Sequence, residues 1–159
     1  MNPASPVRGS VAIFRKDLLP LSETFVKDQV RSPRRWNPVL IGFRYVETTM
    51  LDGLEHRLVR SASSTGAFRR GVRALRYAVG VVDPEVERSV RVIGPSLIHA
   101  HFGVDATFIH PTARRLQIPL LVTLHGYDIQ VDERAWKSGG RGQLGRLYPR
   151  LLRRLVSDR

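Results

Sequence analysis

The stretch DPEVERSVRVIGPSLIHAHFG, residues 83–103, decides the fold class, because it predicts a helix that leads directly into a buried strand. Asp83 is a capping residue, and the proline and glutamate that follow it favour a helix start. Apolar side chains then recur on one helical stripe until Gly94-Pro95 ends the helix. Residues 97–101 follow as a short apolar run with two histidines, which predicts a strand whose polar end faces a site.

The same alternation of strand and helix extends outward from this stretch in both directions. Further strands are predicted at residues 11–14, 39–43, 57–60 and 119–124, and the last of these has the strongest signal of burial. Helices are predicted at residues 22–30 with Ser22 as the cap, at 68–79, at 105–116 with Pro111 inside, and at 144–156, which is basic and amphipathic. This pattern predicts an α/β fold with an open, Rossmann-like parallel sheet and helices on both faces.

Residues 1–10 are predicted to be a flexible lead, and residues 11–159 a single Rossmann-like domain. The chain stops in the last predicted helix, where an open sheet normally continues, so we expect it to be truncated. It has no cysteine, which excludes disulfides and cysteine chemistry. A signal peptide and a membrane-spanning run are not seen, which makes a cytoplasmic location the default expectation.

The net charge is +12, and most of the excess is arginine. Residues 56–82 and 134–157 carry basic residues and no acidic one. Such a surface attracts phosphates or anionic membrane, although an ordinary solvated surface explains it equally well. The sequence contains no DNA- or RNA-binding motif, so nucleic acid is not an expected partner.

Candidate site residues gather in three segments, at 22–25, 101–103 and 125–128, each predicted to lie beyond the carboxyl end of a strand. Ligands of open parallel sheets bind at this edge. His101 either hydrogen-bonds a ligand hydroxyl or is satisfied by the backbone, and the same alternatives hold for His125, which Asp128 could orient. Glu23 either contacts a ligand or serves the helix start. His99 lies two residues deeper on the same face of the strand and is expected to be buried structure.

Other chemistries lack their sequence signals. Two histidines on one strand have no third ligand cleanly placed for a metal. The P-loop, the nucleophile elbow and the dinucleotide-binding glycine pattern are all missing.

Three segments resemble bacterial family-4 glycosyltransferases. PLSETFV at residues 20–26 is similar to their "P-x-SETF" start, and IHAHFG at 98–103 to their "hAHF" strand. IPLLVTLHGYD at 118–128 resembles their "GIPLVvTlHGyD" strand and loop. The similarity covers about residues 11–156. Gln117 stands where the family commonly has glycine, and Pro111 interrupts a helix that usually lacks it.

The resemblance implies the N-terminal, acceptor-binding half of a two-domain GT-B enzyme. Such an enzyme transfers a sugar from a nucleotide-sugar to a saccharide or lipid-linked acceptor, with retention of configuration and without a metal or other cofactor. It would be hexosyltransferase-like and serve cell-envelope or exopolysaccharide synthesis, with peripheral contact at the inner face of the membrane. The C-terminal donor domain is absent, so this chain alone is expected to be inactive.

The resemblance also assigns residues. His101 falls at the position of a catalytic cleft histidine. The remaining positions are carried over as substrate-binding residues, namely Ser22, Glu23, Thr24, Gly103, His125, Gly126 and Asp128. The alternative is a non-catalytic Rossmann-like module that binds saccharide or anionic membrane.

Overall fold

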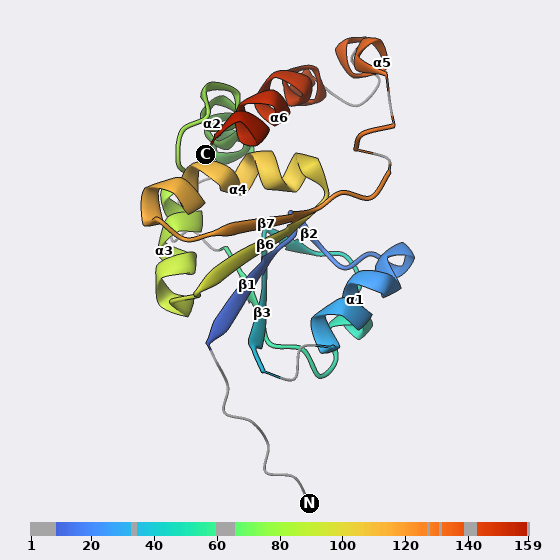
Figure 1. The fold of residues 1–159 in the computed structure, drawn as a ribbon, viewed down its shortest axis with the longest axis vertical. Helices are drawn as coiled ribbons and strands as arrows, with labels where there is room; N and C mark the ends of the chain where they lie inside the picture. Colours follow the sequence, from blue (N-terminus) through green and yellow to red (C-terminus); the bar gives the residue numbers. More distant parts are fainter. Residues whose placement is uncertain are drawn as a thin grey trace, which may run out of the picture.

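A computed structural model describes residues 9–32, 35–59, 66–126, 128–130, 132–138 and 143–158 (Figure 1). Its centre is a sheet of five parallel strands in the order β5-β3-β1-β6-β7. The strands are β1 Ser10–Phe14, β3 Asn37–Gly42, β5 His56–Leu58, β6 Leu97–His101 and β7 Leu120–Thr123. The predicted α/β class with an open, Rossmann-like parallel sheet is confirmed.

The connections between these strands contain the helices and one small ladder. The α-helices are α1 Thr24–Arg31, α2 Gly66–Val79, α3 Pro84–Ile93, α4 Gly103–Leu116, α5 Glu133–Lys137 and α6 Tyr148–Ser157. Short 3-10 helices are η1 Leu21–Glu23, η2 Thr48–Leu51 and η3 Gln143–Leu147. A two-residue parallel pair, β2 Asp17–Leu18 with β4 Arg44–Tyr45, continues beyond the ends of β1 and β3.

Helices cover both faces of the sheet, as predicted (Figure 1). On one face, Phe14 and Ala100 pack with the apolar stripes of α3 and α4. On the other face, Val11 and Ile13 pack with α1 and with the buried residues of η2. Alternate side chains along β1 therefore belong to two separate apolar clusters, as expected for a strand that is buried on both faces.

The helix-to-strand stretch that opens the sequence argument folds as predicted. Asp83 caps α3, because its carboxylate accepts from the backbone N–H of Glu85 at 2.9 Å and that of Val86 at 3.5 Å. Gly94 ends the helix in the left-handed region, with φ of 58°. The strand β6 then occupies the predicted residues 97–101.

Several local predictions are wrong. Ser22 does not cap α1, because η1 precedes that helix and its N-cap position is taken by Glu23 without a side-chain cap bond. The strand β7 lies at an edge of the sheet, with Leu121 49% exposed, although its apolar run predicted the most buried strand. Its apolar residues are covered on one side only. The predicted strand end at Arg60 and most of the predicted lead, residues 1–8, lie outside the described residues.

The two prolines within predicted helices have different outcomes. Pro111 is accommodated inside α4, which is continuous from Gly103 to Leu116. Pro149 lies in the first turn of α6, where its missing N–H costs nothing, so the basic helix starts at Tyr148 and not at residue 144.

The strand order places a switch point at the centre of the sheet. From β1 the chain moves outward to β3 and β5, and it then returns to the other side of β1 with β6 and β7. The connections beyond the carboxyl ends of β1 and β6 therefore diverge, which is where open α/β sheets bind their ligands. Arg15 follows β1 at this point, and His101 ends β6.

Two glycine-to-alanine substitutions test the packing at the start of α4. A Cβ at Gly103 would lie closer to the Tyr148 hydroxyl than any contact allows, whereas a Cβ at Gly71 in α2 meets no atom within 4 Å. We expect Gly103→Ala to lower the free energy of unfolding by about 1–3 kcal/mol. Gly71→Ala should raise it by about 0.5–1 kcal/mol. Urea unfolding measures both, and equal effects would contradict the predicted contact with Tyr148.

Candidate functional site

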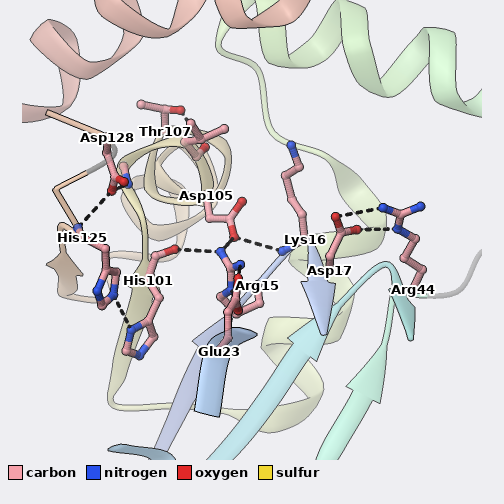
Figure 2. A network of polar contacts seen from close by, with 12 residues as sticks. Arg15, Lys16, Asp17, Glu23, Arg44, His101, Asp105, Thr107, His125 and Asp128 are labelled. Carbon is pink, nitrogen blue, oxygen red and sulfur yellow. Dashed lines mark hydrogen bonds and ion pairs between the residues drawn. The ribbon is translucent and has the colours of Figure 1, made fainter. Parts of the chain in front are cut away.

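The guanidinium of Arg15 is the hub of the polar network at the switch point (Figure 2). It forms a two-bond ion pair with Glu23, with Nε donating at 3.0 Å, and a second ion pair with Asp105. Its Nη1 also donates to the carbonyl of His101 at 3.2 Å. These bonds join the ends of β1 and β6 to η1 and α4. All three charged side chains are buried.

Asp105 lies in the first turn of α4, under the end of β1. Its carboxylate accepts from Arg15 and from the backbone N–H of Lys16 at 3.2 Å. Burial raises the pKa of Asp105 to about 6, even though the charges of Arg15 and Lys16 act in the opposite direction. Desolvation of the carboxylate therefore outweighs its ion pair.

His101 and His125 form a hydrogen-bonded pair beside this hub (Figure 2). Nδ1 of His101 lies 3.2 Å from Nε2 of His125, so one of these nitrogens carries the shared proton. His101 is fully buried, while His125 is half-buried. The Nε2 of His101 has no hydrogen-bond partner among the described residues. A buried nitrogen without a partner is costly, so this atom marks the place where a ligand hydroxyl or water would be stabilised.

The burial of the two strand histidines differs from the prediction that His99 is the deeper one. His99 is half-buried, and its Nε2 lies 2.8 Å from the hydroxyl of Thr123 in β7. Its imidazole lies 4.2 Å from that of His101 between ring centroids. His99 thus has a structural partner, as expected, but His101 is the more enclosed ring.

Asp128 closes the loop after β7 by binding backbone. One carboxylate oxygen accepts from the N–H of Gly103 at 2.6 Å and from that of His125 at 3.4 Å. The expected contact was between Asp128 and the imidazole ring of His125. In the structure Asp128 instead binds the backbone N–H of His125. Its other oxygen, Oδ1, is buried without a partner among the described residues. The backbone carbonyl of Asp128 accepts from the Tyr148 hydroxyl at 3.1 Å, which ties this loop to α6.

Aromatic rings surround His125. Phe25 from α1 lies 4.8 Å from the His125 imidazole between ring centroids, and Phe102 lies 4.5 Å from it. Phe102 has a left-handed φ of 71° and its ring lies under the guanidinium of Arg15, at 4.3 Å. Phe25 remains 39% exposed. The half-buried His125 and the exposed part of Phe25 thus form an aromatic surface in front of the buried His101.

The predicted site residues divide into two groups. Glu23, His101, Gly103, His125 and Asp128 belong to the bonded network, and all but His125 are buried. Gly126 starts the turn after His125 with φ of 58°, and its carbonyl accepts from Gln130 at 2.7 Å. Ser22 in η1 and Thr24 at the start of α1 are exposed and form no bond to this network in the described residues.

Arg15 and Asp105 are absent from the predicted site. Arg15 is the first of three consecutive charged residues directly after the apolar run 11–14, and a charge at the end of a buried strand is a signal that could indicate it. The acid three residues after the motif His101-Phe102 is the matching signal for Asp105. Neither signal says that the two side chains meet, since they are 90 positions apart in the chain.

Within the described ranges, no group of three or more His, Asp or Glu side chains is placed to hold a metal ion. The described part of the chain also contains no helix that is long and apolar enough to cross a membrane.

Fold and site together define a Rossmann-like α/β module with a polar, aromatic-lined site at its switch point. No protein-family model matches the chain, and no curated protein sequence matches it. Among solved structures, the chain is similar to the UDP-GlcNAc 2-epimerase from Methanocaldococcus jannaschii, with a TM-score of 0.42 and 11% sequence identity. The match covers 95% of this chain and 37% of that chain. A likeness this distant carries no argument about what this chain binds or catalyses.

The free energy of unfolding should fall at acidic pH because the buried His101 resists protonation. Burial lowers the pKa of His101 from its ordinary value of 6.5 to about 3, and the nearby charges of His99, His125 and Arg15 act in the same direction. Between pH 6.5 and about 3 the unfolded chain binds a proton that the folded chain excludes, so stability falls as the pH falls through this window. The upper bound on the slope is about 1.4 kcal/mol per pH unit.

His101→Gln should flatten this loss of stability in urea unfolding series at decreasing pH. His56→Gln, at an exposed histidine, should leave it unchanged. Asp105 acts in the opposite sense, because its raised pKa makes its contribution fall as the pH rises from 3.8 to about 6. An NMR titration in which the His101 ring becomes protonated near pH 6.5 would contradict the prediction.

Glu23 is expected to stabilise the fold, because without it the buried Arg15 keeps only the carboxylate of Asp105 as an ion-pair partner among the described residues. Glu23→Ala should lower the free energy of unfolding by about 3–5 kcal/mol. The matched control is Glu55→Ala, which removes a surface carboxylate that accepts from Asn37 at 3.1 Å. That change should cost less than about 1 kcal/mol. Similar losses in the two variants, measured by urea unfolding, would show that the Arg15 hub is not a stabilising feature.

Proposed function

We propose that this chain is the acceptor-binding half of a sugar-transferring enzyme of the GT-B type. The observation that carries the proposal is the buried Nε2 of His101, which has no hydrogen-bond partner among the described residues. His101 lies at the switch point of the sheet and is bonded to His125, whose ring contacts Phe25. A five-stranded parallel sheet flanked by helices is compatible with one half of such an enzyme. The three motif segments of the resemblance come together around this point.

The chemistry of the surface suits a saccharide. One face of a pyranose ring is lined with C–H groups, which pack well on an aromatic ring such as that of Phe25. The hydroxyls around its edge need hydrogen-bond partners. His125 offers an imidazole at the surface, and His101 behind it offers a nitrogen that has no partner within the described residues.

In this proposal the buried His101 acts first on His125. The 3.2 Å bond between them fixes which nitrogen of each ring carries a proton, so His125 presents a defined donor or acceptor to the sugar. The low pKa of His101 keeps it neutral at physiological pH, which makes its Nε2 a neutral partner for a hydroxyl. Holding the acceptor hydroxyl in place is the contribution that such a domain makes to transfer.

Transfer itself would require a second domain that supplies the nucleotide-sugar and stabilises its leaving diphosphate. The retaining outcome and a hexose donor are the finer parts of this proposal, and they rest on the sequence motifs. No metal is assigned to the reaction. We expect sugar transfer only when a donor domain is joined to the chain.

Saccharide binding is tested with saturation-transfer NMR on the chain and a panel of soluble oligosaccharides. Phe25→Ala should weaken the affinity of the chain for the saccharide that binds by about tenfold, because it removes the ring on which the sugar stacks. The control is Phe68→Ala, which removes a ring that is 69% exposed on α2. UDP-glucose should give no comparable signal with the chain alone.

The outcomes separate the proposal from its alternative. Saccharide binding that depends on Phe25, together with transfer once a donor domain is joined, supports the acceptor half. Binding without transfer in that joined protein would favour a non-catalytic saccharide-binding module. A panel in which no saccharide binds, or in which Phe68→Ala weakens binding as much as Phe25→Ala, would overturn the proposal.

A further inference from the structure

A cavity lies on the other side of the Arg15–Asp105 pair from the histidines. Its volume is about 430 Å³. Lys16, Phe43 and Val104 line it at the carboxyl ends of β1 and β3 and at the start of α4. The far wall comes from α2, α5 and η3. No residue of the histidine site contributes to its lining.

The walls of this cavity are aromatic and firmly packed. The rings are those of Phe43, Tyr77, Phe108 and Trp136. Phe108 stacks on Tyr77 with ring centroids 5.8 Å apart, and it meets Phe43 edge to face at 5.2 Å. The Trp136 ring packs on Tyr148 of α6 at 4.5 Å. The walls are thus set by packing on neighbouring elements, and this gives the cavity a preformed shape.

The hydroxyl of Tyr77, on the aromatic wall, already has a hydrogen-bond partner within the protein. The hydroxyl of Tyr77 lies 3.1 Å from that of Thr107, which directs it away from any ligand. Burial raises the pKa of Tyr77, so this hydroxyl stays neutral. The aromatic part of the cavity therefore suits an apolar ring better than a polar group.

The cationic residues of the cavity are not equally available. Arg73 is paired with Asp83 at 2.8 Å and with Glu85 at 2.9 Å, and its guanidinium lies 3.8 Å from the centre of the Phe43 ring. Lys16 and Arg70 form no ion pair in the part of the chain that the structure describes. In Figure 2 the ammonium of Lys16 points away from the carboxylate of Asp105.

The carboxylates nearest to Lys16 are each ion-paired with an arginine. Asp17 is paired with Arg44, and Asp105 is paired with Arg15. None of the described lining residues is acidic. The cavity therefore combines an apolar aromatic wall with two positive charges that form no ion pair among the described residues, an arrangement that attracts an anion bearing an apolar ring.

We propose that this cavity is a binding site for a ring-bearing phosphate ester, with the ring against Phe108 and the phosphate between Lys16 and Arg70. A phosphate carries close to two negative charges at neutral pH, which matches these two cations better than a carboxylate does. The inference does not rest on the proposed saccharide site, because no residue of the histidine site lines this cavity.

Isothermal titration calorimetry tests the proposal with 1-naphthyl phosphate on the full chain. The apolar half alone is represented by 1-naphthalenemethanol, and the charged half by inorganic phosphate. We expect naphthyl phosphate to bind at least about tenfold more tightly than either half, because each half uses only one feature of the cavity. Since Trp136 lines the cavity, its fluorescence should change on binding, and a Trp36→Phe background isolates that signal.

Charge variants distinguish this site from general attraction to a chain of net charge +12. Lys16→Gln and Arg70→Gln should each weaken the affinity for naphthyl phosphate by about tenfold. Lys27→Gln on α1 and Arg150→Gln on α6 remove the same charges elsewhere and should have little effect. His125→Ala should leave naphthyl phosphate unaffected, so failure of this inference and failure of the saccharide site remain separate results.

Three results would overturn the proposal. The first is binding of naphthyl phosphate that is no tighter than that of inorganic phosphate. The second is equal weakening by the cavity variants and the Lys27 and Arg150 controls. The third is association only with phosphatidylcholine vesicles that contain phosphatidic acid, without binding of the soluble ester, which would indicate a membrane headgroup and not a soluble ligand.

Discussion

The guanidinium of Arg15 is the constraint on which the candidate site depends. A buried cation is tolerated only when carboxylates and carbonyls satisfy it, and Arg15 obtains these from Glu23, Asp105 and the His101 carbonyl. Those partners come from η1, α4 and β6. One buried charge thereby sets the relative positions of the elements that diverge at the switch point, and its removal would leave uncompensated charge in several of them.

The hydrogen bonds around Arg15 also position the neighbouring site residues. The His101 carbonyl is held by Arg15, so its ring lies in one place beside His125. Asp128 holds the backbone of His125 and of Gly103, and the missing side chain at Gly103 lets Tyr148 reach the same loop. On the other side, Lys16 contributes its N–H to Asp105 and its ammonium to the aromatic cavity. Two different surfaces therefore share one rigid support.

Most of the sheet could be predicted because its signals are local. The cap at Asp83 and the left-handed glycine at Gly94 depend on adjacent residues, and β6 was therefore placed correctly to the residue. The burial of β7 could not be predicted, because an apolar run has the same composition at the edge of a sheet as at its centre. The predicted cap at Ser22 is wrong because the 3-10 helix η1 precedes α1 and places Glu23 at its N-cap position.

The sequence by itself determined the α/β class, the order of strands and helices along the chain, and the three segments that carry His101, His125 and Glu23 to one edge. The periodicity of apolar residues and the capping signals are properties of short segments, so they need no fold to be recognised. Only the tertiary structure decided that Arg15 joins Glu23 to Asp105, that His101 is enclosed while His125 is half-exposed, and that Lys16 faces a separate cavity. Pairing and burial depend on which distant segments meet, and no local pattern encodes that meeting.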